Sequence, residues 1–308
     1  MPRVFAVSDI HVDLWENSSV VKGWSHDVYG EDTLILAGDV TDDILLLEKT
    51  LKHLKSVFAT VYFVPGNHDL WVRSRSEIDD KVTSISKLHS IQSLCEKIGV
   101  LTGPEKIDIS PENHIWIVPL MSWYSKPDDF PDDSLHMPAA CPEDERMSEE
   151  MWMDNYLCVF PQHDGFRKSE YFAKLNEGIL KEYDGPVISF SHFLPRSDLV
   201  HFSQEDLDNL REWRKTNDIP YPKPEIIEKM KKFNFSRFAG SKLIEKQIRH
   251  LGSIIHVYGH QHRNKDVDKD GVRYVSHCLG YAKERTAGAV VGMLGSSSET
   301  CQPKQIWP

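Results

Sequence analysis

The 308-residue sequence has no apolar run of the about 18 residues that a membrane-spanning helix requires. It holds only five cysteines, an odd number without a C-x-x-C pair, which argues against a disulfide framework and a zinc ribbon. The amino-terminal residues also lack the apolar core of a secretory signal. We therefore expect a protein that does not enter a membrane and that works in the cytoplasm.

Positive charge is scarce as well. The chain carries 36 Lys and Arg against 47 Asp and Glu, a formal net charge of −11 at pH 7. Nucleic acids are held largely by Lys and Arg that contact phosphates, and we find no basic and aromatic tract that could line a single-strand channel. We do not expect nucleic acid to be a partner, and the sequence leaves protein partners unknown.

Short apolar runs, each ending in a polar or glycine-containing block, recur along the chain and predict buried strands. They lie at 4–7, 33–37, 57–64, 115–120, 187–190, 254–258 and 272–276. Helical patterns separate them at 44–55, 76–98, 167–183 and 242–251. This alternation predicts an α/β or mixed α+β layered fold.

Two segments interrupt the alternation, at about 122–165 and 193–239. Both are rich in proline, and the first is acidic. Long irregular connections in a compact domain are usually functional loops or linkers, and the aromatic residues here, such as Trp123, Trp152, Trp213 and Tyr221, favour ordered structure. We predict one domain over 1–308 with these segments inserted as caps.

Residues with metal-ligand side chains follow five of the predicted strands. Asp9 and His11 follow the first, and an extended backbone would send both to the same side. Gly38 and Asp39 follow the second, and Gly66-Asn67-His68-Asp69 follows the third. The later strands end in Ser191-His192 and Gly259-His260-Gln261-His262.

The carboxyl ends of strands gather at one edge of an α/β sheet, so these blocks can converge although they lie far apart in sequence. A single histidine after a strand is more often a hydrogen-bonding residue than a ligand. Five such blocks, all at strand ends, instead predict a metal site.

The blocks D-x-H, G-D, G-N-H-D, S-H and G-H-x-H resemble the calcineurin-like metallophosphoesterase family. The resemblance implies a four-layer αββα sandwich, in which two mixed β-sheets pack face to face with helices outside. It further implies that Asp9, His11 and His262 bind one metal ion, that Asn67, His192 and His260 bind a second, and that Asp39 bridges the two.

Oxygen and imidazole ligands without thiolate suit two transition-metal ions, which could be Mn, Fe or Zn. Such a pair can present a bridging hydroxide to the phosphorus of a phosphomonoester or phosphodiester, in a small molecule or a nucleotide. By the resemblance, His68 protonates or stabilises the leaving oxygen and Asp69 orients His68.

Three further residues are weaker candidates for substrate binding. Arg73 and Arg196 could each hold a phosphate through their forked donors, although an exposed helix face or surface role explains them as well. Tyr281 could stack on a substrate ring, although core packing is the commoner role of a tyrosine.

Other functions use the same metal centre. A nuclease is disfavoured by the acidic charge, and a protein phosphatase would have to overcome repulsion between acidic caps and acidic phosphopeptides. A scaffold without catalysis would be expected to lose ligands, and none is missing here. The sequence therefore predicts a metal-dependent phosphoric ester hydrolase and leaves its substrate open.

Overall fold

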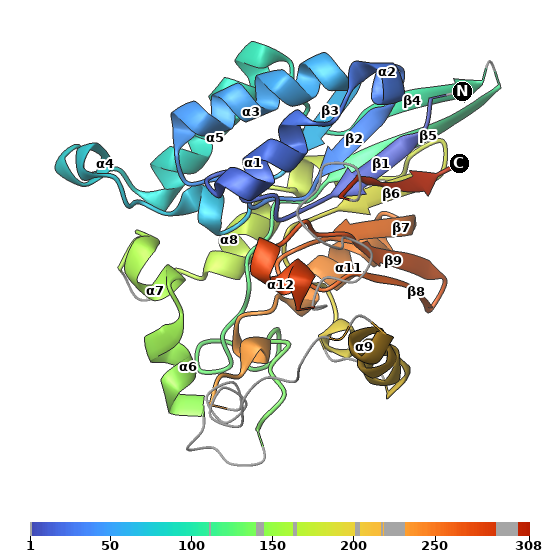
Figure 1. The fold of residues 1–308 in the computed structure, drawn as a ribbon. Helices are drawn as coiled ribbons and strands as arrows, with labels where there is room; N and C mark the ends of the chain where they lie inside the picture. Colours follow the sequence, from blue (N-terminus) through green and yellow to red (C-terminus); the bar gives the residue numbers. More distant parts are fainter. Residues whose placement is uncertain are drawn as a thin grey trace.

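The computed structural model describes residues 2–110, 112–139, 145–162, 165–200, 204–216, 218, 232–287 and 301–308. In this part of the chain, two β-sheets lie face to face and helices cover their outer faces (Figure 1). This arrangement confirms the predicted mixed fold of two sheets flanked by helices. No helix in the described ranges combines the length and apolar character needed to cross a membrane.

The first sheet has the strand order β10-β1-β2-β3. β1, β2 and β3 are parallel, and β10 pairs antiparallel with β1. The bounds are Val4–Val7 for β1, Thr33–Leu36 for β2, Thr60–Phe63 for β3 and Lys304–Trp307 for β10.

The second sheet has the order β4-β5-β6-β7-β9-β8. Its central strands β5, β6, β7 and β9 are parallel, and the edge strands β4 and β8 are antiparallel to their neighbours. The bounds are Glu105–Ser110 for β4, Asn113–Pro119 for β5, Val187–Phe190 for β6, Ser253–Tyr258 for β7, Lys265–Lys269 for β8 and Val272–Ser276 for β9.

Alternating side chains divide each strand between two apolar layers. Ala6 packs with Ile188 and Val257 in the layer between the sheets. The next residue, Val7, points the other way, into the layer that holds Leu51 of the covering helices. Both faces of β1 are therefore buried, which explains why its sequence is a continuous apolar run.

Most helices of the amino-terminal half cover the first sheet (Figure 1). Among them, α3 begins after Asp43, whose side chain accepts hydrogen bonds from two backbone amides of the first turn, and buries Leu47, Leu51 and Leu54. The bounds are Trp15–Lys22 for α1, His26–Tyr29 for α2, Ile44–Val57 for α3, Arg75–Asp79 for α4 and Ser84–Ile98 for α5, with a 3-10 turn η1 at His68–Leu70.

Most of the described helices of the carboxyl-terminal half are short. α11 buries Ile244 and Ile248, and it contacts both β7 and α8 on the outer side of the second sheet. The bounds are Arg146–Met151 for α6, Asp154–Leu157 for α7, Lys168–Lys174 for α8, Gln204–Thr216 for α9, Lys242–His250 for α11 and Ala282–Thr286 for α12, with 3-10 turns at Glu177–Ile179, Ser197–Leu199 and Phe235–Arg237.

Three predicted elements are wrong in their bounds. The helix predicted over 76–98 is two helices, because Lys81 adopts a φ of 54° and Thr83 starts a new helix with a side-chain cap. The helix predicted over 167–183 ends at Lys174, and Asn176 uses its side chain to bond the backbone of Met121. The strand predicted at 57–64 begins only at Thr60, since α3 continues to Val57.

The two segments predicted as caps contact each other. Asn234 donates from its side chain to the Met137 carbonyl (2.9 Å), and its backbone amide donates to the Ser148 hydroxyl (2.8 Å). The Arg237 guanidinium bonds Glu145 at 2.9 Å and Glu149 at 3.3 Å. Residues 122–139 and 145–162 thus pack on residues 232–239, whereas Tyr221 and the Trp213 side chain lie outside what the structure describes.

Candidate metal centre

Loops that follow five strands meet at one edge of the sheets, where parallel β1, β2 and β3 end on one side and β6 and β7 on the other. Backbone hydrogen bonds tie these loops together, as between the Asp9 amide and the Gly38 carbonyl (2.9 Å) and between the Gly259 amide and the His192 carbonyl (2.9 Å). The structure gathers all the predicted ligands here: Asp9, His11, Asp39, Asn67, His192, His260 and His262.

The first group of ligand atoms comes from the loops after β1 and β7. The Nε2 atoms of His11 and His262 lie 3.0 Å apart, and Oδ1 of Asp9 lies 3.4 Å from Nε2 of His262. Atoms of all three residues lie within 4.8 Å of one another. One ion could contact all three.

The second group surrounds His192. Its Nε2 atom lies 3.1 Å from Oδ1 of Asn67, 3.2 Å from Nδ1 of His260 and 3.4 Å from Oδ1 of Asp39. The other Asp39 oxygen, Oδ2, lies 4.0 Å from Nε2 of His11 in the first group. Asp39 therefore stands between the groups, with one oxygen toward each.

Hydrogen bonds on the far side of the imidazole rings indicate which nitrogens carry protons. Nδ1 of His192 lies 2.9 Å from the Ala37 carbonyl, and Nε2 of His260 lies 3.1 Å from the Phe238 carbonyl. A carbonyl only accepts, so these nitrogens donate, and in a neutral ring the opposite nitrogen keeps its lone pair. The lone pairs of His192 and His260 then face each other, an arrangement that a cation between them would stabilise, so these residues fit a bound metal.

A carboxylate orients one ring of the first group in the same way. Nδ1 of His262 lies 2.7 Å from Oε2 of Glu284, which also accepts from the Tyr281 amide at 2.8 Å. A carboxylate behind a ligand histidine fixes the ring and makes it more basic. Burial lowers the pKa of His262, but the carboxylates of Asp9 and Glu284 outweigh burial and raise this pKa to about 10.

Burial and mutual repulsion set the charge of the remaining groups. Burial and the neighbouring His262 lower the pKa of His11 to about 3. Burial and the nearby carboxylates of Asp9 and Asp69 raise the pKa of Asp39 well above its usual value. A buried set of neutral imidazoles and crowded carboxylates is one that a cation stabilises.

Left-handed backbone conformations recur at the ligands. The φ angles are 51° at Asp9, 36° at His11, 58° at Asp39, 71° at His260 and 52° at His262. The extended backbone assumed in the sequence argument for Asp9 and His11 is therefore wrong, although both residues reach the same group. Asp and His tolerate this region better than most residues, and such strain is typical of functional sites.

His68 lies at the edge of the centre, where its side chain remains 22% exposed. Its amide donates to Oδ1 of Asp39 at 2.9 Å, and its Nε2 lies 3.9 Å from Oδ2 of the same residue. The ring stacks on Trp71, with 3.6 Å between centroids. Burial and the surrounding histidines lower the pKa of His68 well below its usual value. His68 therefore reaches the same space as the ligands from a partly open side.

Asp69 bonds the backbone of neighbouring loops. Its carboxylate accepts from the amides of Gly66 (2.8 Å), Asp39 (2.8 Å), Val40 (2.9 Å) and Thr41 (3.0 Å). These bonds join the loop after β2 to the loop after β3. Asp69 thus positions Asp39 and the Asn67–His68 loop through the main chain, whereas the sequence argument placed its contact at the His68 ring.

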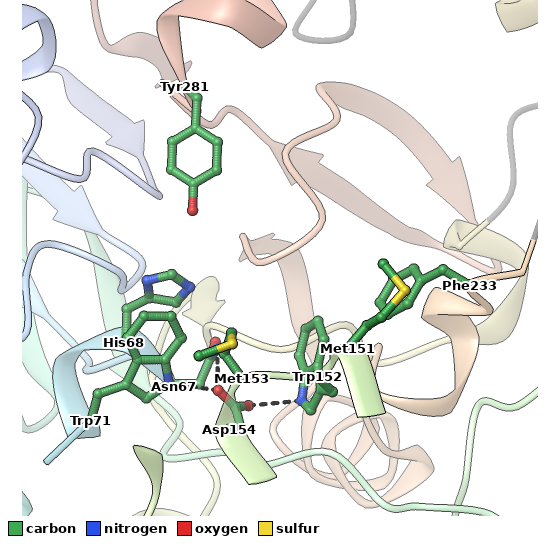
Figure 2. A pocket seen from close by; sticks show the side chains of 9 residues that line it. All are labelled: Asn67, His68, Trp71, Met151, Trp152, Met153, Asp154, Phe233 and Tyr281. Carbon is green, nitrogen blue, oxygen red and sulfur yellow. Dashed lines mark hydrogen bonds between the residues drawn. The ribbon is translucent and has the colours of Figure 1, made fainter. Parts of the chain in front are cut away.

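A cavity of about 270 Å³ opens beside the ligands (Figure 2). Asn67, His68 and Trp71 lie along one side, Tyr281 lies across from them, and residues of the two predicted cap segments form the remaining wall (Figure 2). That wall is mainly apolar and consists of Met151, Trp152, Met153, Asp154 and Phe233. An organic group attached to a phosphate at the metal centre would find apolar surface here.

The three weaker candidates have different positions. Tyr281 lines the cavity, with its ring centroid 4.8 Å from that of His11. Arg73 forms a two-bond ion pair with Asp42 (2.6 and 3.0 Å), and it is not one of the residues that line the cavity.

Arg196 also lies apart from the cavity lining. It binds three carboxylates, those of Asp198 at 2.9 Å, Glu245 at 3.1 Å and Asp270 at 2.9 Å. A guanidinium with three such partners has few donors left for a phosphate.

Sequence reasoning missed the cap residues of the cavity and the carboxylates behind the ligands. Met151, Met153 and Phe233 carry no chemical signature, and Trp152 was noted only as an aromatic residue of a cap. Glu284 could have been noticed as a capping residue three positions after Tyr281. Nothing in the sequence pairs it with His262.

Comparison with known proteins gives related results. A model of the family described as calcineurin-like phosphoesterase matches residues 2–192. The [acyl-carrier-protein] phosphodiesterase PptH of Mycobacterium tuberculosis is 23% identical over 288 residues, which are 92% of this chain and 79% of that protein.

A solved structure shows the same fold. The crystal structure of the phosphopantetheinyl hydrolase PptH of M. tuberculosis superposes with a TM-score of 0.63 at 24% identity, covering 92% of this chain and 91% of that one. The structure of TT1561 of Thermus thermophilus is more distant, with a TM-score of 0.46 at 12% identity, covering 90% of each chain. The chain belongs to the calcineurin-like phosphoesterase family, and it is a metal-dependent phosphoric ester hydrolase.

Proposed function

We propose that the centre binds two metal ions and hydrolyses a phosphodiester whose organic substituent occupies the adjacent cavity. Asp9, His11 and His262 would hold one ion, the residues around His192 would hold the other, and Asp39 would contact both. Two separate ion positions are supported by the two compact groups of ligand atoms. In the second group, the facing lone pairs of His192 and His260 would both contact the ion. When bound, the ions would activate water and neutralise charge on the phosphoryl oxygens.

The metal is proposed to be Mn, Fe or Zn, since the donors are nitrogen and oxygen without thiolate. Metal analysis of the purified protein tests this point and the number of ions. A protein that carries no transition metal and takes none up would instead favour a scaffold. A cytoplasmic location is also proposed, in keeping with the free thiols of Cys95, Cys158 and Cys278.

The single observation that carries the diester proposal is the apolar cavity beside Asn67 and His68. A phosphomonoester presents only one substituent, which departs, whereas a diester keeps a second organic group that a site can bind throughout the reaction. The relative named as an acyl-carrier-protein phosphodiesterase supports the same class. A phosphopantetheinyl arm, a long thin diester-linked chain, is therefore the natural substrate to try first.

Different residues of the chain would bind the substrate and assist the reaction. Trp71, Met151 and Phe233 would hold the organic substituent, and Tyr281 would close the cavity opposite them. His68 reaches the centre from the partly open side, where a leaving group would depart. We propose that His68 donates a proton to the leaving oxygen or stabilises it, and that Asp69 fixes its loop.

The decisive experiment measures initial rates of the Mn²⁺-loaded protein on p-nitrophenyl phosphate and bis-p-nitrophenyl phosphate. We expect the diester to be preferred and the Asp39→Asn variant to lose at least about 100-fold in rate, because the bridging charge is removed. Preference for the monoester would contradict the diester proposal while leaving the hydrolase intact.

A phosphopantetheinylated carrier protein is then the specific substrate, with release of the arm followed by mass spectrometry. Phe233→Ala should raise KM for this substrate several-fold and leave the KM for methyl p-nitrophenyl phosphate, which has no long arm, nearly unchanged. Equal effects on both substrates would indicate that the cavity does not bind the arm.

A further inference from the structure

One carboxylate of the cap segment reaches the metal centre from outside the ligand set. Asp154 begins α7 and is only 2% exposed. Oδ1 accepts from Nδ2 of Asn67 at 2.9 Å and from Nε1 of Trp71 at 2.6 Å, and Oδ2 accepts from Nε1 of Trp152 at 3.0 Å. Figure 2 shows these bonds meeting at the carboxylate of Asp154, below the cavity in this view.

The bond to Asn67 has a consequence for the metal centre. An amide can bind a metal through its oxygen, whereas its NH₂ group has no lone pair to offer. The carboxylate of Asp154 accepts hydrogen bonds, so it holds the NH₂ end of Asn67 and turns the oxygen away. That oxygen, Oδ1, lies 3.1 Å from Nε2 of His192, among the ligands.

The surroundings leave Asp154 little freedom. Two indole N–H groups, from Trp71 and Trp152, fix its carboxylate from the sheet side and the cap side. Those indoles also line the cavity, so the same carboxylate joins the cavity wall to a proposed metal ligand. No other described hydrogen bond of the Asn67 NH₂ group competes with this one.

We infer that Asp154 is a positioning residue, which fixes the Asn67 amide with its oxygen toward the second metal ion and so ties the cap to that ion's site. The inference rests on the proposed role of Asn67 as a ligand. The alternative is that Asp154 only anchors the cap to the sheet through the two indoles. The two roles differ in what they predict for metal affinity.

The test titrates metal-stripped protein with Mn²⁺ by calorimetry and counts bound ions after dialysis. Asp154→Ala should weaken the binding of one of the two ions by about 10–100-fold, which is the usual effect of removing a group that holds a metal ligand in place. The affinity for the other ion should not change. Asp154→Asn, whose amide oxygen can still accept from Asn67, should recover most of this loss.

Trp152→Phe is the matched control, because it removes an indole donor to the same carboxylate and keeps the bond to Asn67. It should leave both Mn²⁺ affinities unchanged. If Asp154→Ala keeps both affinities, or if Trp152→Phe weakens the same ion equally, Asp154 is a cap anchor and the inference is wrong. Wild-type protein that binds fewer than two ions would overturn the proposed ligand set itself, and the inference with it.

A second pair of variants serves if Asp154→Ala does not fold. Asn67→Asp places two carboxylates against each other, and adding Asp154→Asn restores an N–H donor between the positions. We expect the double variant to bind the second ion, the one proposed to contact residue 67, more tightly than Asn67→Asp alone does. Affinities that change independently at the two positions would refute the coupling.

Discussion

At the scale of single residues, a substitution of His68 can test proton transfer without disturbing metal binding. Its ring is partly exposed and lies just beyond bonding distance of Asp39, so its removal should leave the ligands in place. We predict that His68→Ala keeps both metal ions but loses about 100-fold or more in rate on an alkyl diester, whose leaving oxygen needs a proton.

The same variant should lose much less on bis-p-nitrophenyl phosphate, because p-nitrophenolate leaves without protonation. Comparing the two substrates under saturating Mn²⁺ measures the difference. An unchanged rate with the alkyl diester would remove His68 from the reaction.

Asp69 is predicted to act on stability as well as on rate. Four backbone amides donate to its carboxylate, and an asparagine amide has only one oxygen to receive them. We expect Asp69→Asn to lower the free energy of unfolding by about 2–4 kcal/mol, measured by urea denaturation, because buried N–H donors lose their partner. A loss below about 0.5 kcal/mol would mean that the loops hold their shape without it.

At the scale of elements, we expect the contact between the two predicted cap segments to depend on pH. Burial raises the pKa of Glu145, but hydrogen bonds from the Ala139 amide and from the side chains of Asn234, His136 and Arg237 outweigh burial and lower this pKa to about 2. A carboxyl whose pKa is lowered by folding stabilises the fold above its unfolded pKa of about 4.3, and this stabilisation is lost as the pH falls toward 2.

We therefore predict that Glu145→Gln destabilises the protein by about 1–3 kcal/mol at pH 7. The difference from wild type should shrink as the pH falls through 4 toward 2. Urea denaturation at pH 7, 5, 4 and 3 measures it. A difference that stays constant over this range would show that the Glu145 charge does not support the cap contact.

At the scale of the whole molecule, the proposed metal ions connect loops from both sheets. The first group unites the loop after β1 with that after β7, so an ion there crosses between the layers. A metal ion that binds only the folded state stabilises it by about 2.7 kcal/mol when the ion is present at 100 times its dissociation constant.

Chelation should therefore lower the melting temperature by roughly 5–10 °C, as measured by calorimetry, and added Mn²⁺ should restore it. Asp39→Asn is the control, because it removes a proposed ligand of both ions and should show a smaller shift on chelation. Equal melting temperatures with and without metal would contradict a bridging role between the sheets.

The sequence predicts best the strands that are buried on both faces. β1 and β6 have the predicted bounds, because strands buried on both faces are mainly apolar and so stand out as short apolar runs. The edge strands β4, β8 and β10 were not predicted, since an edge strand can be polar on one face and still pair with its neighbour. The break between α4 and α5 was missed because capping by Thr83 competes with a continuous helical pattern.

The sequence by itself determined the family and the residue types at the metal centre. Asp9, Asn67 and His260 follow the ends of strands, a position that points to a metal site when several such residues share it. Because the strands are parallel, their ends bring these residues to one edge. Local patterns suffice for this because each block depends only on its own strand.

Only the tertiary structure decided what stands around those residues. The cavity brings together His68, Met151 and Phe233, which follow one another in the chain at intervals of about 80 residues. Likewise, the bond between Asp154 and Asn67 spans 87 positions. Such contacts leave no local periodicity, because the sequence around an apolar residue or a carboxylate does not indicate which distant residue it will contact. Only the packing of the folded chain decides that.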